Sequence, residues 1–75
     1  MPRLPIVPPR KLIKVLKKKG FVLHRVKGSH HIFIRTSDRL TVTVPVHPGH
    51  DLGRGLTESI LKDAKISTED FLKLL

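Results

Sequence analysis

The chain has 75 residues, with 15 lysines and arginines against six aspartates and glutamates, a net charge of +9 and no cysteine. This length predicts one small domain, without room for a second lobe or for a deep cleft around a large organic cofactor. The lack of cysteine excludes disulfides and thiolate zinc sites and agrees with a cytoplasmic location. No apolar run approaches the roughly 18 residues of a membrane span, and the Pro-rich start lacks the apolar core of a signal peptide. We therefore expect a soluble, unprocessed, cytoplasmic protein.

The positive charge is concentrated in the first half of the chain. Residues 1–37 contain ten basic residues and no acidic residue, whereas residues 38–75 contain five basic and six acidic residues, so the two parts sum to +10 and −1. A field of one sign on so small a domain raises the local concentration of polyanions. The charge therefore predicts contact with nucleic acid rather than a surface that only promotes solubility.

The first predicted elements are an N-terminal segment and a helix. Residues 1–9 are expected to form a loose Pro-rich segment, because proline blocks helix and ladder hydrogen bonds, and residues 10–75 are expected to form the domain. Pro9 suits a first helical turn, and Gly20 suits the C-terminal stop of the helix. One apolar stripe contains Leu12, Ile13 and Leu16, with Val15 at its margin. The opposite face offers three lysines to a phosphate backbone: Lys11, Lys14 and Lys18.

Three strands and two more helices are predicted to follow. The strands cover residues 21–27, 30–36 and 39–44, and a loop follows them because Pro45 and Pro48 end the third strand. The second helix covers about residues 53–64 and is expected to bury Leu56, Ile60, Leu61 and Ala64. Ser67 is expected to cap a short last helix. Helices that flank a run of strands collect on one sheet face, so we predict an α+β two-layer sandwich.

Gly28-Ser29 predicts a two-residue hairpin turn between the first two strands, because type II′ turns favour glycine at the first central position. Lys27 then faces His30 across the hairpin, and Arg25 lies on the same face. This face of the hairpin is expected to be exposed to solvent, because burying two cations beside an imidazole is costly in free energy. The other face is expected to pack inward. It carries Val22, His24, Val26, His31, Phe33 and Arg35, with both histidines partly buried and hydrogen-bonded to backbone.

His30 is the candidate catalytic residue. The neighbouring Lys27 disfavours the charged imidazole, so His30 is expected to be neutral near pH 7 and able to take a proton from a ribose 2′-hydroxyl or from water. Lys27 and Arg25 would hold the phosphate whose charge grows in the transition state. His47 and His50, in the loop after the third strand, are possible second acid/base groups if that loop folds back towards the turn.

The order of motifs resembles the HicA (YcfA-like) family of toxins from toxin–antitoxin modules. The resemblance covers about residues 10–75 and is carried by "KLIKVLKKKGFVLHRVKGSHHIF", "VTVPVH" and "LGRGLTESILKDAKISTEDFLKLL". It implies a fold like that of double-stranded-RNA-binding domains, an mRNA endonuclease that acts independently of the ribosome, and a HicB-like antitoxin that covers the basic active face. We expect no cofactor. The family's catalytic histidine maps onto His30 and its turn glycine onto Gly28, whereas the roles of His47 and His50 do not come from the family.

Two other functions compete with the nuclease. A binding module on the same fold would read RNA shape and backbone, with the first helix and Lys62 and Lys65 as phosphate contacts and no chemistry. A metal site would draw on five residues, although neighbouring strand residues point to opposite faces and so His30 and His31 do not readily share an ion. The five are His30, His31, His47, His50 and Asp51. A chaperone-like role has no support, because three phenylalanines offer little apolar surface.

Overall fold

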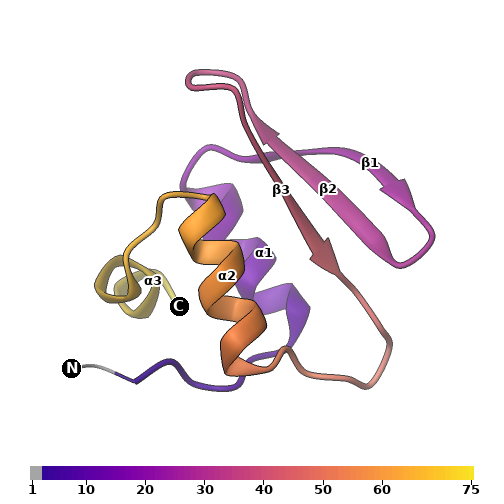
Figure 1. Ribbon diagram of the computed structural model, residues 1–75. Coiled ribbons are helices and arrows are strands. Elements are labelled where there is room, and N and C mark those ends of the chain that lie inside the picture. Colours follow the sequence, from indigo (N-terminus) through magenta and orange to yellow (C-terminus); the bar gives the residue numbers. More distant parts are fainter. Residues whose placement is uncertain (1–2) are drawn as a thin grey trace.

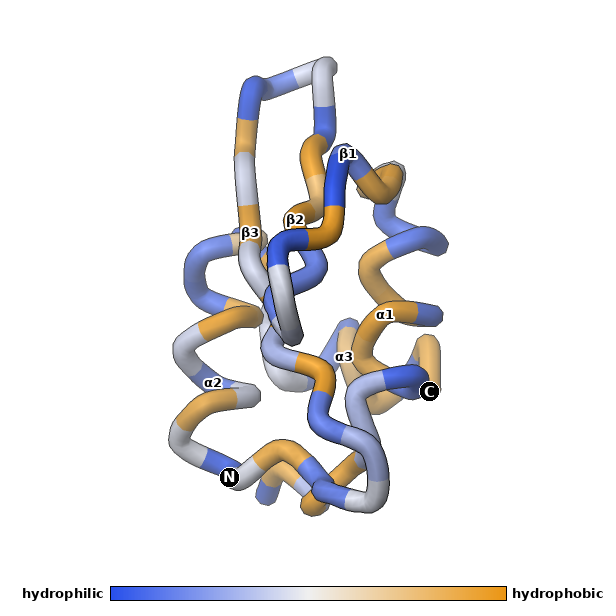
Figure 2. Tube along the Cα trace, turned by 90° about the vertical axis from the view of Figure 1, so that its right-hand side faces the viewer, coloured by the Kyte–Doolittle hydropathy of each residue, from blue (hydrophilic) through white to orange (hydrophobic). Residues whose placement is uncertain are grey.

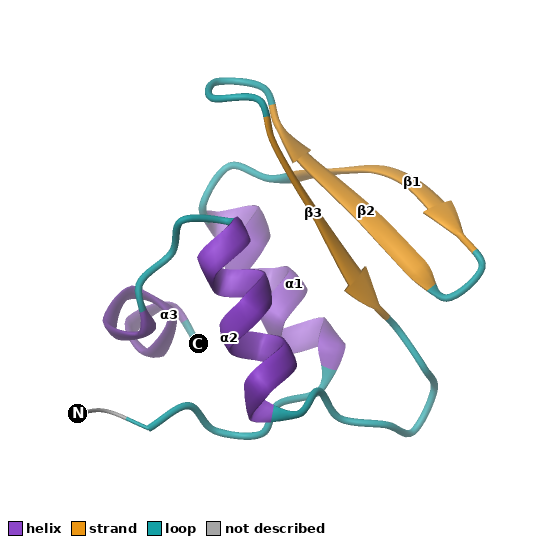
Figure 3. Cartoon of the chain, viewed as in Figure 1, coloured by secondary structure: helices purple, strands orange, loops and turns teal. Residues whose placement is uncertain are grey.

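A computed structural model describes residues 3–75, which form a three-stranded antiparallel sheet with helices on one face (Figure 1). The element order is α1 (Pro9–Lys18), β1 (Val22–Lys27), β2 (His30–Arg35), β3 (Leu40–Pro45), α2 (Arg54–Asp63) and α3 (Thr68–Leu74). The strand order in the sheet is β1-β2-β3. Figure 3 shows the helices gathered on one side of the sheet, which confirms the predicted α+β two-layer arrangement.

The core lies between the sheet and the helices. Phe21, Phe33 and Phe71 are almost fully buried there, together with Val42 and Val44 of β3. The stripe predicted for α1 is confirmed, because Leu12, Val15 and Leu16 are buried and Ile13 packs against the cluster. No helix in the described part of the chain is long and apolar enough to cross a membrane.

The ends of the helices follow from local sequence. Pro9 is the first residue of α1, and Gly20 takes φ +90° just after the helix, as expected for a glycine stop. Ser67 caps α3 as predicted, because its Oγ accepts a hydrogen bond from the backbone N–H of Asp70 at 3.1 Å. In α2 the prediction is wrong for Leu56, which is exposed, and the neighbouring Thr57 is buried in its place.

The N-terminal segment is not loose over its described residues, and that expectation is wrong for residues 4–7. Leu4 and Val7 are buried in the core, and Val7 forms an isolated antiparallel bridge with Leu52. Arg54 also donates from Nε to the backbone carbonyl of Leu4 at 2.7 Å. The prolines exclude regular structure, but the two aliphatic side chains between them gain burial against the loop before α2.

A β-bulge at His24 changes which side chains of β1 face the helices. Val22 pairs with Ile34 and Leu23 with Phe33, whereas beyond the bulge Val26 pairs with His31. The extra residue reverses the alternation, so Leu23 and not Val22 lies on the helix-facing side.

The expected burial of Val22, His24 and Val26 is also wrong. The whole of β1 is exposed. Figures 1 and 2 show β1 as the strand farthest from α2, and in Figure 2 its apolar segments lie at the outer edge of the sheet. The inward-facing side chains of β1 therefore extend beyond the cover that the helices provide.

Arg35 joins three elements at the far end of β2 from the hairpin. Its guanidinium donates to the backbone carbonyls of Lys19 at 2.8 Å and Ala64 at 3.3 Å, and it pairs with both carboxylate oxygens of Asp38. It also lies over the ring of Phe21, 4.6 Å from the centroid. The hydrogen bond from Arg35, with its positive charge, lowers the pKa of Asp38 below the ordinary 3.8. This cluster connects the C-terminal ends of α1 and α2 to the sheet.

Candidate nucleic-acid interface

The turn at Gly28-Ser29 sets the geometry of the candidate site. Gly28 has φ +60°, whereas Ser29 is not among the residues with positive φ, which is the pattern of a type II′ turn. An added Cβ at Gly28 would meet no atom within 4 Å, so the requirement for glycine comes from the backbone alone. The turn brings Lys27 opposite His30, as the sequence predicts.

His30 lies on the sheet face away from the helices. The buried Phe33 marks the helix-facing side of β2, and the strand alternation places His30 on the other side. The imidazole is exposed, as are Lys27 and Arg25 on the neighbouring strand. Arg25 pairs with Ile32, two residues along from His30, so both cations share the face of the imidazole. The structure therefore brings His30, Lys27 and Arg25 together in solvent.

The loop after β3 starts beside the same turn. Pro45 is the partner of His30 on β3, and the backbone N–H of Val46 donates to the carbonyl of Ser29 at 2.7 Å. His47 and His50 follow as exposed residues, with their rings edge to face at 6.5 Å between centroids. The bond extends the pairing of β2 with β3 by one residue. The loop then runs towards residues 8–10, and a part for His47 and His50 in the chemistry stays a prediction.

The lysines predicted on α1 form a separate group. Lys11, Lys14 and Lys18 are exposed on a helix that packs against the opposite face of the sheet from His30. A groove of about 570 Å³ runs along this helix, with Ile13 among the residues that line it. Lys18 also donates to the carbonyl of Leu74 at 3.0 Å, which fastens α1 to the C-terminal end of α3. The cations that line the groove are Arg10, Lys14, Lys17 and Lys18.

His31 has a different environment from His30. Its side chain is half-buried on the helix-facing side, as predicted, opposite Val26 and Val44. The expected hydrogen bond is wrong for its Nδ1, which is buried without a partner among the described residues. Over residues 3–75, no three His, Asp or Glu side chains are grouped so that they could hold a metal ion.

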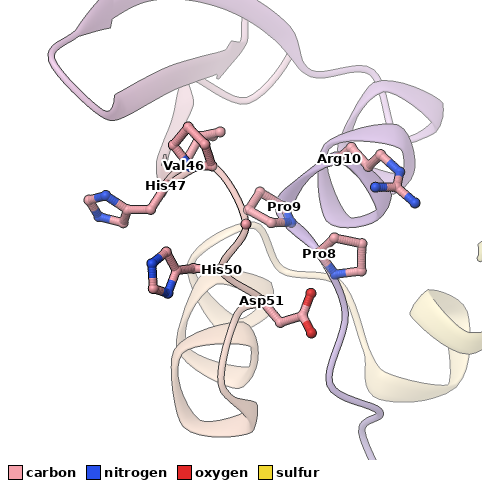
Figure 4. Close-up of a pocket in the computed structure, with 9 residues that line it drawn as sticks. Pro8, Pro9, Arg10, Val46, His47, His50 and Asp51 are labelled. Atoms are coloured by element: carbon pink, nitrogen blue, oxygen red, sulfur yellow. The ribbon is translucent and has the colours of Figure 1, made fainter.

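A second cavity was missed from sequence. It has a volume of about 300 Å³ and lies between residues 8–10 and residues 46–51 (Figure 4). The sequence does indicate that this segment can pack on the core, because Leu4 and Val7 are apolar residues three positions apart between the prolines. Once that segment packs on the core, Pro8 and Pro9 meet the loop after β3.

The comparison with family models agrees with this geometry. A model described as the HicA toxin of bacterial toxin–antitoxin systems matches residues 9–66, which is well over half of the chain. The matched region includes the hairpin, His30 and the loop after β3. The search of curated proteins found no match.

Proposed function

Because this chain belongs to the HicA toxin family of bacterial toxin–antitoxin systems, we propose that it is an mRNA endonuclease that acts without a metal ion. The observation that carries the proposal is the exposed His30 directly opposite Lys27 at a fixed turn. A HicB-like antitoxin would silence the enzyme by covering this basic face. The reaction would take place in the cytoplasm, where transcripts are translated.

His30 is proposed to act as the general base. A neutral imidazole accepts the proton of a ribose 2′-hydroxyl, whose oxygen forms a bond to the adjacent phosphorus while the bond from phosphorus to the 5′-oxygen breaks. Lys27 and Arg25 would stabilise the extra negative charge on the phosphoryl oxygens in the transition state. Both cations are exposed on the sheet face that carries His30, so a phosphate of the RNA can reach them.

The departing 5′-oxygen requires a proton, for which His47 and His50 are the proposed donors. Both imidazoles are exposed and follow the residue that is hydrogen-bonded to the turn. Replacing each with alanine in turn assigns the role, because loss of the acid lowers turnover while RNA affinity is kept.

The test is cleavage of labelled RNA by the purified protein in the presence of EDTA. We expect wild type to cut, and His30→Ala to lose about 1,000-fold in rate with RNA affinity largely retained. His24→Ala is the matched control, because His24 is another exposed histidine of the same sheet, placed at the bulge. Equal cleavage by His30→Ala and wild type, or cleavage that EDTA abolishes, would contradict the proposal.

A binding module without chemistry is the second candidate, and the groove along α1 favours it. Four cations line that groove on the layer away from His30, so RNA could bind there without approaching the imidazole. Such contacts are mainly ionic, and affinity should fall steeply with salt. RNA bound by both wild type and His30→Ala, with no cleavage by either, would support the module and contradict the nuclease.

A further inference from the structure

The cavity between the N-terminal segment and the loop after β3 is a candidate site of its own, and we refer to it as the loop pocket. Its described lining comes from residues 8–10 on one side and residues 46–51 on the other. Figure 4 shows His47 and His50 on one side of the loop, with Asp51 on the other side near Pro8. In the loop pocket the carboxylate of Asp51 therefore lies beside the proline rings, and the two imidazoles lie across the loop from it.

Hydrogen bonds and burial hold both walls of the loop pocket. The N–H of Leu52 donates to the carbonyl of Val7 at 2.8 Å, and Arg54 donates to the carbonyl of Leu4. Val7 and Leu52, which adjoin the lining residues Pro8 and Asp51 in the chain, are buried in the core together with Leu4. At its other end the loop is tied to Ser29 through Val46, which joins the wall to the turn that carries His30. The loop pocket is therefore preformed and connected to the catalytic hairpin.

The charges of the loop pocket indicate what kind of group it takes. Asp51 is the one acidic residue in its described lining, and Arg10 is the one arginine. Neither belongs to the ion pairs found among residues 3–75. A carboxylate repels the phosphates of RNA but accepts hydrogen bonds from the edge of a base, and an arginine binds phosphate. The rings of Pro8 and Pro9, on the same side of the loop as Asp51, supply an apolar surface against which an unstacked base can pack.

We propose that the loop pocket binds one unstacked base of the RNA substrate, with guanine preferred. Guanine presents two adjacent N–H donors, N1–H and N2–H, which match the two oxygens of Asp51. Adenine and cytosine present one amino group on that edge, and uracil presents one N–H between two carbonyls, so each satisfies the carboxylate less well. Arg10, whose guanidinium points away from the loop in Figure 4, binds a phosphate of a neighbouring nucleotide. This inference rests on the proposed function, because the base belongs to the RNA that His30 cuts.

The first test measures binding of single nucleotides and needs no cleavage. The full chain is titrated with 5′-GMP, AMP, CMP and UMP while its backbone amide signals are followed by NMR. We expect GMP to shift the signals of Gly49, His50 and Asp51 and to bind about 10-fold more tightly than UMP. Asp51→Asn should reduce this ratio to about 2, because an amide supplies only one acceptor oxygen. Asp63→Asn is the control, since it makes the same charge change at an exposed residue of α2.

The second test uses RNA cleavage and separates the two proposals. Short oligoribonucleotides that differ at one base are cut by wild type, Asp51→Asn and Asp63→Asn, and the ratio of rates between guanine and uracil is compared. GMP binding that depends on Asp51 in a protein that cuts no RNA would uphold the loop pocket and overturn the nuclease. RNA cleavage together with equal affinity for all four nucleotides, or with shifts outside residues 46–51, would overturn the loop pocket and leave the nuclease standing.

Discussion

The two ends of β2 hold their polar side chains in opposite ways. At one end, Arg35 is mostly buried, donates to two backbone carbonyls and pairs with Asp38. At the other end, His30 is exposed, and the pairing of the backbone with Lys27 fixes where it lies. One strand thus carries a cation that joins the elements of the fold and an imidazole that is exposed to solvent. We refer to the end of β2 at Arg35 as the fold end and to the end at His30 as the site end. Side-chain hydrogen bonds hold the fold end, whereas the geometry of the turn sets the site end.

After the loss of His30 itself, the largest expected effect at the site end comes from Lys27, which faces His30 across the hairpin. Lys27→Glu places a carboxylate opposite His30, where it repels the scissile phosphate and removes a cation that would stabilise the transition state, so turnover should fall about 100-fold. Lys14→Glu makes the same charge change on α1 and should cost about fivefold through weaker RNA binding. Cleavage rates at saturating and subsaturating RNA separate the two effects. Comparable losses from both variants would show that Lys27 only adds to the general positive field.

At the fold end, Arg35→Ala should lower stability and leave the chemistry intact. The substitution removes the donor to the carbonyls of Lys19 and Ala64, and the two lost bonds together should cost about 2 kcal/mol in the free energy of unfolding. Urea denaturation followed by circular dichroism measures this loss. Arg39→Ala, which removes an exposed arginine from the adjacent turn, is the control.

Cleavage assays of Arg35→Ala below its unfolding transition complete the comparison. We expect the rate per folded molecule to equal that of wild type, because Arg35 lies at the opposite end of β2 from the hairpin. A fall in that rate as large as the one for Lys27→Glu would remove the division of β2 into a fold end and a site end.

Much of this division could be predicted from local sequence. The apolar stripe and the glycine after it predicted α1. Gly28-Ser29 predicted the turn and with it the pairing of Lys27 with His30. These features depend on residues close in the chain, for which spacing and turn chemistry are sufficient. The site end is therefore the part that the sequence predicts best.

The errors lie where distant segments decide the outcome. The bulge at His24 moves Leu23 to the helix-facing side, and neither residue carries a local signal for an extra residue in the strand. The burial of Leu4 and Val7 depends on Leu52, 45 or more residues away in the chain. The sequence predicts Arg35 on the inward face, but it does not indicate that the side chain binds the carbonyls of Lys19 and Ala64, which are distant in the chain. Long-range packing thus produced both the cluster at the fold end and the loop pocket.

The smallest expected effect is a pH dependence from the ion pair at the fold end. The hydrogen bond from Arg35 lowers the pKa of Asp38, so the folded protein binds this proton more weakly than the unfolded chain does. The contribution of Asp38 to stability is therefore present above its ordinary pKa of 3.8 and is lost as the pH falls through the lower value of the folded state. Because Asp38 is exposed, the effect is modest.

The measurement compares wild type with Asp38→Asn by urea denaturation from about pH 6 to about pH 2.5. We expect wild type to be the more stable protein at the upper end and the difference to close at the lower end. Repeating the pair in the Arg35→Ala background gives a double-mutant cycle in which the difference should be small at every pH, because the partner is gone. A difference that persists at low pH, or that survives in the Arg35→Ala background, would show that Asp38 stabilises the turn by itself and not through Arg35.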